Sequence, residues 1–429
     1  MILESIRGQH VERDNLHSSA HWAFSKVDQW LLQEIHQSAG RPPVRLALEN
    51  SAAVSMPGAV PVATIRLRDR MTLLGLILDP DAGFGDAYAE GRIVVEGELV
   101  TALEALDRAA CRSHSRNAYA SILAKGLGYL QRNSLRGARK NIHRHYDLSN
   151  DFFQLWLDPQ LVYSCAYFPS NALTLDEAQV AKMDYICRKL NLRPGERVLD
   201  IGSGWGALAL HMARHYGVTV RGFGISREQV LWARRRAMEA DLGDRVEFIE
   251  DDYRNVLGTY DALVSVGMLE HVGAEHFKDM GRIIDRSLGP SGRGLMHTIG
   301  RNSPRPFSTW ITKRIFPGAY APTLRETMDI FEPWDFSILD VENLRSHYAR
   351  TLEHWLERFE GSVHQVSAMF GADFARMWRL YLAAAIAGFR TGSLQLFQIV
   401  FARTDCRQIP PTRIHLYREE SRTSEATGD

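Results

Sequence analysis

The feature that most constrains the fold is a strand-to-turn pattern at residues 197–206, which read RVLDIGSGWG. An apolar run ends in an acid, and glycines then follow at the alternate positions Gly202, Gly204 and Gly206. An amphipathic segment, residues 207–216, begins immediately after the last glycine. Because glycine lets the backbone turn sharply and approach a ligand closely, this pattern predicts a buried strand that turns directly into a helix beside a ligand site.

Two kinds of ligand site begin with such a turn. The dinucleotide-binding fingerprint has a further glycine two residues beyond Gly206, where helix and strand pack together, but that position is Leu208. The compact G-x-G-x-G form has no pyrophosphate to hold and suits an amino-acid carboxylate beside backbone N–H groups. The loop therefore favours a site for S-adenosylmethionine (SAM) over one for a nicotinamide or flavin dinucleotide.

After about residue 141 the chain alternates between short apolar runs and helical segments. The predicted strands are residues 197–201, 219–223, 246–249, 262–266, 294–298 and 394–402. Helices are predicted at residues 227–240 and 275–288. This alternation predicts an α/β fold with a mostly parallel, Rossmann-like sheet and helices on both faces, as in class I SAM methyltransferases. Ligands of such sheets bind beyond the carboxyl ends of the strands.

The length of 429 residues predicts more than one domain. Residues 1–108 are interpreted as a smaller N-terminal α+β domain with a possible lipid or dimer role, and residues 141–405 as the SAM-dependent catalytic domain. From residue 108 to 146 there are nine basic residues and no acidic ones. Residues 109–140 are therefore either a solvated linker or a basic segment that faces anionic lipid headgroups. Residues 406–429 form a C-terminal tail.

The composition excludes several classes of protein. The 51 basic residues balance the 51 acidic ones, so no overall field favours nucleic acid. The four cysteines are scattered without a C-x-x-C pair, which argues against a disulfide framework or a structural zinc site. No apolar signal core opens the chain, and its apolar runs are far shorter than the roughly 20 residues that span a bilayer. We expect a cytoplasmic protein that associates peripherally with the inner face of the cell membrane.

Polar residues follow the predicted second and third strands, where a cofactor would bind. No acid follows the second strand; Ser226 caps the next helix there, and Gln229 is a candidate partner for the ribose. After the third strand come Asp251, Asp252 and Tyr253. A carboxylate at this place can accept the adenine amino group while the tyrosine ring stacks on the base.

The fourth and fifth strands end in ionisable residues that are unusual among apolar neighbours. Glu270 and His271 follow the fourth strand, and His297 lies at the end of the fifth. Burying such groups is unfavourable unless they are paired or functional, and neighbouring strand ends face the same cavity. An aromatic stretch, residues 161–168, surrounds Cys165 upstream of the glycine turn.

Taken together, these motifs resemble the cyclopropane fatty acid synthase family. The resemblance rests on YSCAYF (163–168), the glycine loop (198–206), VSVGMLEHVG (264–273), HTIG (297–300), HYD (145–147) and WITKRIFPG (310–318). It covers roughly residues 141–405 with the motifs in order, and the N-terminal domain more loosely. The combination of YSCAYF, LEHVG and HTIG is highly specific, whereas G-x-G-x-G alone is not.

The resemblance implies that a bicarbonate ion binds in the active site, and it implies no metal. The implied holders of the ion are Cys165, Glu270, His297, the backbone of Ile299, and Tyr348. The SAM pocket that it implies comprises Tyr163, Ser164, Gly202, Ser203, Gly204, Gly206, Ser226, Gln229, Asp252 and Tyr253. Some members carry a cysteine in a late helix where this chain has Ala385, so this chain cannot use a nucleophilic cysteine there.

The resemblance also implies the reaction. The SAM methyl group is transferred to a cis double bond of an unsaturated phospholipid acyl chain at the membrane surface, and bicarbonate-assisted deprotonation closes a cyclopropane ring. The intermediate carbocation requires the exclusion of water, and aromatic faces can stabilise it. The candidate rings are Tyr163, Tyr167, Phe168, Trp205 and Trp310.

Three alternatives stay open from the sequence. Loss of a different proton from the same cation would give a methyl-branched or methylene fatty acid. A SAM methyltransferase acting on nitrogen or oxygen of a small molecule or RNA is a second alternative, and a non-catalytic lipid-binding protein is a third. We expect no nucleic-acid partner, and a homodimer is an expectation from the family alone.

Overall fold

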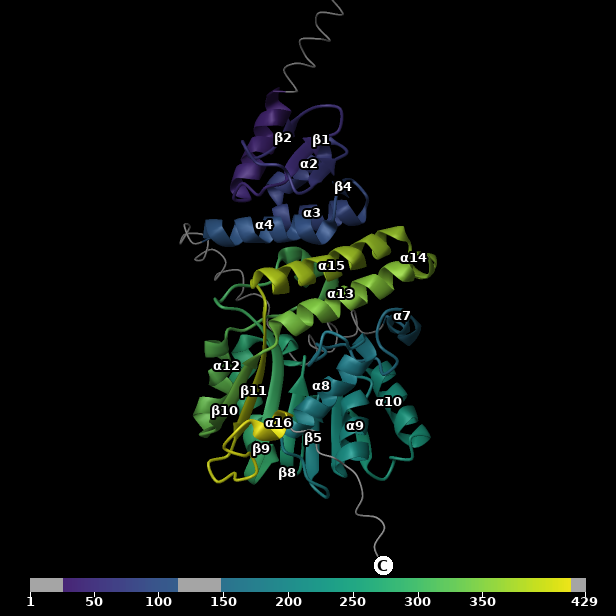
Figure 1. The fold of residues 1–429 in the computed structure, drawn as a ribbon, viewed down its shortest axis with the longest axis vertical. Coiled ribbons are helices and arrows are strands. Elements are labelled where there is room, and N and C mark those ends of the chain that lie inside the picture. The colour runs from purple at the N-terminus through teal and green to yellow at the C-terminus, as the bar shows by residue number, and fades with distance from the viewer. Residues whose placement is uncertain (1–25, 115–147, 418–429) are drawn as a thin grey trace, which may run out of the picture. The chain divides into compact units, whose positions relative to one another are not determined.

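The computed structural model describes residues 26–114 and 148–417 (Figure 1). These residues divide into two compact units. The first unit comprises the described residues within 1–131, 305–317 and 352–394, and the second those within 132–304, 318–351 and 395–429. Most of the basic segment 109–140, the HYD motif and the end of the C-terminal tail lie outside the described residues. The roles assigned above to each domain stay predictions.

The second unit is built on a seven-stranded sheet among the described residues, in the order β10-β11-β9-β8-β5-β6-β7. Its strands are β5 (Arg197–Ile201), β6 (Thr219–Gly224), β7 (Val246–Glu250), β8 (Tyr260–Val266), β9 (Leu288–Gly300), β10 (Ser337–Asn343) and β11 (Gln395–Ala402). The strands β5 to β9 pair in parallel, whereas β11 pairs antiparallel with both β9 and β10. The predicted mostly parallel sheet and its six predicted strands are thus confirmed.

Helices cover both faces of this sheet. The α-helices of this unit are α7 (Asn150–Gln154), α8 (Leu175–Lys189), α9 (Ala207–Tyr216), α10 (Arg227–Glu239), α11 (Phe277–Ser287), α12 (Leu324–Phe331) and α16 (Ile414–Tyr417). Of these, α8, α9 and α10 pack on one face and α11 and α12 on the other. Single-turn helices are η1 (Tyr253–Asn255), η2 (Leu269–His271), η3 (Ala274–His276) and η5 (Glu332–Trp334). The helix predicted at residues 275–288 corresponds to η3 and α11. It ends at Ser287, before Gly289 and Pro290.

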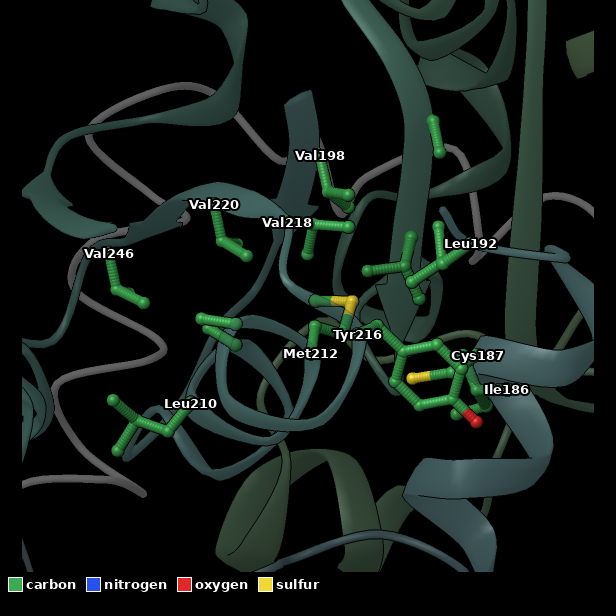
Figure 2. Packing of buried hydrophobic residues seen from close by; sticks show 14 of the residues in the cluster. Ile186, Cys187, Leu192, Val198, Leu210, Met212, Tyr216, Val218, Val220 and Val246 are labelled. Atoms are coloured by element: carbon green, nitrogen blue, oxygen red, sulfur yellow. The ribbon is translucent and has the colours of Figure 1, made fainter. Parts of the chain in front are cut away.

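The alternating side chains of the strands enter two separate hydrophobic cores. Val198, Val220 and Val246 pack with α8, α9 and α10 in one core, where Met212 and Tyr216 lie against them (Figure 2). Residues next to these in sequence point the other way: Leu199 packs with α11 and α12 in the second core. Because successive strand residues point to opposite faces, an apolar run without polar interruptions indicates a strand that is buried on both sides.

The sequence did not predict the edge strand β10, which reads SILDVEN. None of its residues is fully buried, and acidic side chains interrupt its apolar pattern. An edge strand pairs on one side only and tolerates charged residues, so the pattern of a buried strand does not apply to it.

The first unit contains a four-stranded sheet in the order β2-β1-β3-β4. Its strands and helices are β1 (Arg45–Leu48), β2 (Ala53–Val54), β3 (Thr64–Leu67), β4 (Ile93–Glu96), a helix over residues 26–38, α2 (Arg70–Leu78), α3 (Pro80–Ala89) and α4 (Leu99–His114). The later elements are η4 (Ile311–Ile315), α13 (Arg345–Gly361), α14 (Val363–Phe370) and α15 (Ala372–Thr391); α13 begins in the second unit. The small α+β unit expected from the N-terminal sequence is present, and within the first unit α15 packs against α3 and α4. Among the described residues, no helix is both long and apolar enough to cross a bilayer.

Candidate active site

The glycine turn has the predicted form. Gly202, Gly204 and Gly206 adopt positive φ angles of 88°, 53° and 84°, so the chain leaves β5 through conformations that favour glycine. The N–H groups of Gly202 and Ser203 both donate to the carbonyl of Phe223, at 2.9 and 3.1 Å. These two bonds fasten the turn to the end of β6, so those N–H groups support the loop and are not available to hold a cofactor carboxylate.

A pocket opens at the carboxyl ends of β5, β6, β7 and β8, as the sheet topology requires. Nine of the ten residues predicted for the SAM site line it: Tyr163, Ser164, Gly202, Ser203, Gly204, Ser226, Gln229, Asp252 and Tyr253. The same pocket takes in segments far apart in sequence, from Leu161 to Val272. The sheet therefore brings the predicted SAM residues together around one cavity.

Gly206 is the one predicted SAM residue that does not line the pocket. A Cβ atom at this position would lie 2.6 Å from Cζ of Phe248 and 2.9 Å from Cβ of Ala233. Gly206 therefore allows the start of α9 to pack closely against β7 and α10. Its role is in building the turn.

The residues after β6 and β7 take specific positions at the pocket. Ser226 caps α10, because its hydroxyl accepts from the N–H of Gln229 at 3.5 Å, as predicted. Both oxygens of Asp252 accept from the guanidinium of Arg254, at 2.8 and 3.0 Å. Burial raises the pKa of Tyr253 to about 12, which keeps this phenol protonated. The pairing with Arg254 holds the Asp252 carboxylate in place at the pocket wall.

Two charged residues at the pocket were not named as site residues from the sequence. Lys182 of α8 and Asp200 of β5 both line it, and each is only 2% exposed. Burial lowers the pKa of Lys182 to about 8 and raises that of Asp200 to about 7. The ammonium donates to the hydroxyl of Ser164 at 2.9 Å, and Oδ2 of Asp200 has no hydrogen-bond partner among the described residues. One buried amine and one buried carboxyl group thus face the same cavity.

Glu270 follows β8 in the short helix η2 and is 5% exposed. Its Oε1 accepts from the N–H of Ile299 at 2.5 Å, so the structure joins two residues that the resemblance assigns to one ion. Its Oε2 has no hydrogen-bond partner in the described part of the chain. Burial raises the pKa of Glu270 to about 7, and the bond from Ile299 opposes this shift. The Ile299 N–H is occupied by Glu270 here, so only one of the two groups can meet an ion directly in this arrangement.

His297 lies on β9, two residues before Ile299 and on the same side of that strand. It is 2% exposed, and its Nδ1 lies 3.0 Å from Nε2 of Gln398 on the neighbouring β11. Burial and the nearby charges of Lys182 and Lys189 lower the pKa of His297 well below its usual value. The ring is therefore neutral at physiological pH. Within residues 26–114 and 148–417, its Nε2 has no hydrogen-bond partner.

The start of α13 connects the backbone at Tyr348, and the thiol of Cys165, to β11 and β9. The thiol of Cys165 lies 4.0 Å from the carbonyl of Leu344, one turn before Tyr348. The N–H of Leu344 donates at 2.8 Å to Leu396, which pairs directly with Ile299. Complete burial raises the pKa of Cys165 far above its ordinary range, so the thiol stays protonated and cannot act as a thiolate nucleophile.

The five residues predicted to hold bicarbonate do not line the SAM-type pocket itself. Two of them adjoin it in sequence: Ser164 of the pocket precedes Cys165, and the pocket residues Met268 and His271 lie on either side of Glu270. The backbone N–H of Gly267, also at the pocket, donates to the carbonyl of His297 at 2.8 Å.

The predicted aromatic residues separate into three groups. Tyr163 and Trp205 line the pocket, and the ring of Phe153 contacts both, with centroid distances of 5.6 and 5.0 Å. Tyr167 stacks on Tyr185 at 4.2 Å, and Phe168 does not line the pocket either. Trp310 belongs to the first unit, where it packs against Gly85. Tyr163 and Trp205 are therefore the rings with a structural basis for contact with a reacting chain.

The raised pKa of Glu270 predicts a pH-dependent contribution to stability. The folded-state pKa of about 7 exceeds the ordinary pKa of 4.5, so the folded state holds the extra proton between these pH values. The stabilisation is present below pH 4.5 and is lost as pH rises through about 7, by about 3 kcal/mol for this group. We expect Glu270→Gln to gain stability relative to the wild type between pH 5 and pH 8.

Urea unfolding of both proteins at the two pH values measures this difference. Glu275→Gln, at an exposed position nearby, is the matched control and should track the wild type. The urea midpoint of each protein is compared between pH 5 and pH 8. If it changed equally in the wild type and in Glu270→Gln, then Glu270 would ionise as readily in the folded chain as in the unfolded one.

Comparison with known proteins gives a consistent result. The sequence model described as mycolic acid cyclopropane synthetase matches residues 133–399. A probable fatty acid methyltransferase of Pseudomonas putida is 34% identical over 399 residues, which cover 90% of this chain and 98% of the relative. The cyclopropane-fatty-acyl-phospholipid synthase of Escherichia coli K12 is 42% identical over 260 residues, covering 60% of this chain and 66% of that enzyme.

A solved structure of a similar protein also supports the α/β fold described above. The mycolic acid cyclopropane synthase CmaA1, crystallised in complex with SAH and CTAB, aligns with a TM-score of 0.59 at 31% identity. The alignment covers 62% of this chain and 98% of that one. With the glycine turn, the pocket at the strand ends and the buried Glu270 and His297, these matches show that the chain belongs to the mycolic acid cyclopropane synthetase family.

Proposed function

We propose that this chain transfers the methyl group of SAM to a cis double bond in an unsaturated phospholipid acyl chain and closes a cyclopropane ring. The observation that carries the proposal is a pair of buried polar atoms, Glu270 Oε2 and His297 Nε2. Neither has a hydrogen-bond partner among the described residues, and both belong to strand ends behind a SAM-type pocket. The name of the E. coli relative supports the same reaction.

The pocket fits the amino-acid end of SAM. The α-ammonium and α-carboxylate of that end carry opposite charges, and Asp200 and Lys182 supply one buried charge of each sign. A buried charge is unfavourable unless it is paired, so a zwitterion that met both side chains would relieve both penalties. Gln229 and Asp252 lie at the same pocket as candidate partners for the ribose and the adenine.

The second site fits a small oxyanion such as bicarbonate, which would supply the base that removes a proton from the delivered methyl group. A neutral His297 with its proton on Nε2 donates a hydrogen bond to such an ion. Tyr348 and Cys165 are further candidate donors, and the Cys165 S–H would have to turn from the carbonyl of Ala166, to which it donates at 3.1 Å. Glu270, with a pKa of about 7, can hold a proton between itself and the ion. Full burial of Glu270, His297 and Cys165 keeps water away from the reacting carbon.

The apolar part of the pocket suits an acyl chain. Leu161, Val162, Val266, Met268 and Val272 line it beside Tyr163 and Trp205. An alkene has no proton to lose before methyl transfer, so the protein contributes mainly by holding donor and double bond in line in a dry site. The aromatic faces stabilise the carbocation without attacking it. Peripheral contact with the inner face of the membrane, and a homodimer, belong to the same proposal.

A second product class follows from the same intermediate. The Pseudomonas putida relative, which this chain covers almost completely, is named a probable fatty acid methyltransferase. If a backbone proton leaves the cation, the product is a methyl-branched chain that keeps a double bond; if a hydride shift first moves the charge to the methyl-bearing carbon, loss of a methyl proton gives a methylene branch.

Incubation with methyl-labelled SAM and phospholipid vesicles that carry cis-unsaturated chains tests the proposal. We expect label in the lipid and the high-field proton resonances of a cyclopropane ring. A ring and a methylene branch have the same mass, so the NMR spectrum decides between them. Label that appears only in small molecules or RNA, or none at all, would contradict the proposal.

Lys182→Met tests the SAM end of the pocket. The methionine keeps the length of the side chain and removes its charge, so the SAM carboxylate would lose an ionic partner. We expect the Kd for SAM, measured by calorimetry, to rise about 10- to 100-fold, as for a lost charge-assisted hydrogen bond. Lys278→Met, on α11 away from the pocket, is the control. An unchanged Kd for Lys182→Met would place the carboxylate elsewhere.

A further inference from the structure

We propose that Gln398, oriented by Lys189, is a positioning residue that holds the proton of the His297 ring on Nε2. The orientation itself stands on contacts between side chains of this chain. Its use in the reaction, donation of that N–H to the bound oxyanion, rests on the proposed function.

The argument begins at Lys189, which closes α8 and is 2% exposed. Its ammonium lies 2.5 Å from Oε2 of Glu342 on β10 and 2.7 Å from Oε1 of Gln398 on β11. The ring of Tyr185 lies 4.8 Å from the same nitrogen. An ammonium only donates, so the Gln398 atom that faces it must be the amide oxygen. This contact therefore directs the NH₂ group of the Gln398 amide away from Lys189.

The other end of the amide is the NH₂ group, and it faces His297. Nε2 of Gln398 lies 3.0 Å from Nδ1 of the imidazole, and Gln398 is fully buried. Because the amide nitrogen only donates, Nδ1 must accept, and it therefore carries no proton. A neutral imidazole has one N–H group, so that proton is on Nε2.

The neutral state of the ring is supported by its surroundings. Burial, Lys182 and Lys189 all disfavour a positive charge on His297. Nε2 has no hydrogen-bond partner among the described residues, so the fold leaves a buried N–H donor unsatisfied. An N–H group on Nε2 can donate a hydrogen bond to an oxyanion. In the opposite tautomer, the lone pair of Nε2 would face the oxyanion and repel it.

Sheet register explains why these residues meet. His297 pairs with Gln398 across β9 and β11, and Gln398 pairs with Glu342 across β11 and β10. Directly paired residues point to the same face of a sheet, so the three side chains form a row across three strands. Lys189 completes this row from the helix that covers that face. Lys189 is thus paired with Glu342, while its proton donation orders the amide of Gln398.

Gln398→Glu is the sharpest test, because it keeps the shape and the contact with Lys189 but replaces the NH₂ donor with an acceptor. We expect the proton of His297 to move from Nε2 to Nδ1, where it can bond the new carboxylate. Two-bond ¹⁵N–¹H NMR of histidine-labelled protein reports the tautomer directly, and His297→Gln identifies the signal. We expect lipid methylation or ring formation to fall about 10- to 100-fold, with the Kd for SAM unchanged.

Gln395→Glu is the matched control: it makes the same chemical change on the same strand, at a side chain whose oxygen accepts from Asn343 at 2.8 Å. It should leave the His297 tautomer unchanged. Lys189→Met provides a second route if the first variant does not fold. It frees the amide to rotate, and both tautomers should then appear in the spectrum.

The outcomes separate the inference from the proposed function. A wild-type ring protonated on Nδ1, or an unchanged tautomer in Gln398→Glu, overturns the inference whatever the enzyme makes. A tautomer switch with full activity overturns the role of the N–H in the reaction. Wild-type protein that makes no modified lipid, or that ignores added bicarbonate in CO₂-depleted buffer, contradicts the proposed function and leaves the NMR result intact.

Discussion

Glu270→Gln is expected to bind SAM as the wild type does and to form the proposed cyclopropane product about 100- to 10,000-fold more slowly, the usual range for loss of a group that handles protons. The amide keeps the size of the side chain and can still accept from Ile299 N–H. It cannot take up or release a proton, and its NH₂ group cannot replace the carboxylate oxygen Oε2. Product formation from labelled SAM, together with SAM affinity by calorimetry, measures the two effects separately.

Glu275→Gln, a nearby exposed substitution, is expected to retain full activity. A branched or hydroxylated lipid from Glu270→Gln would show that methyl transfer survives while ring closure fails, which strengthens the assignment. Wild-type rates of ring formation in Glu270→Gln would remove Glu270 from the mechanism.

Gly206→Val is expected to destabilise the second unit by about 2–5 kcal/mol and to abolish measurable SAM binding. The valine Cβ would lie 2.6 Å from Phe248 and 2.9 Å from Ala233, and the position has a φ of 84°. A β-branched residue is strongly disfavoured at such a φ. Either β7 and α10 move away from the turn or the turn unwinds, and in both cases the wall of the pocket is lost. Thermal unfolding followed with and without SAM measures both effects.

Gly243→Ala is the matched control for this substitution. Its added Cβ would meet no heavy atom of the described residues within 4 Å, and Gly243 is not among the glycines with positive φ. We expect a change in stability below about 0.5 kcal/mol. If Gly206→Val were equally harmless, the close packing of α9 against β7 would not be what the glycine provides.

Nine of the ten residues predicted for the cofactor side of the site line one pocket, because the signals that pointed to them are local. A turn of alternating glycines, the Ser226 cap and the residues that follow β7 depend on backbone conformation over a few residues. The one exception, Gly206, has the same local signal as its neighbours. It faces Phe248 and Ala233 instead of the pocket, and those partners come from elements that follow later in the chain.

Little in the sequence pointed to Lys182 as a residue of the site. It lies on one helix face with Ala178 and Ile186, and a lysine in such a pattern more often packs its apolar stem on the protein and keeps its ammonium in solvent. Only the packing of α8 against the sheet buries its ammonium at the pocket. Lys189 and Gln398 likewise belong to no sequence motif, and only the packing of the fold buries them. The edge strand β10 was missed because its acidic residues interrupt the apolar pattern, yet it supplies Glu342.

By itself, the sequence determined the family, the α/β sheet and the presence of Glu270 and His297 at two strand ends, because short-range periodicity and motif order encode these features. Only the tertiary structure decided which side chains meet. Gln398 lies 101 residues from His297, and a one-residue slip of β11 would turn its amide to the opposite face of the sheet. That register places the Gln398 amide beside the buried His297 ring, which is the contact on which the proposed tautomer depends.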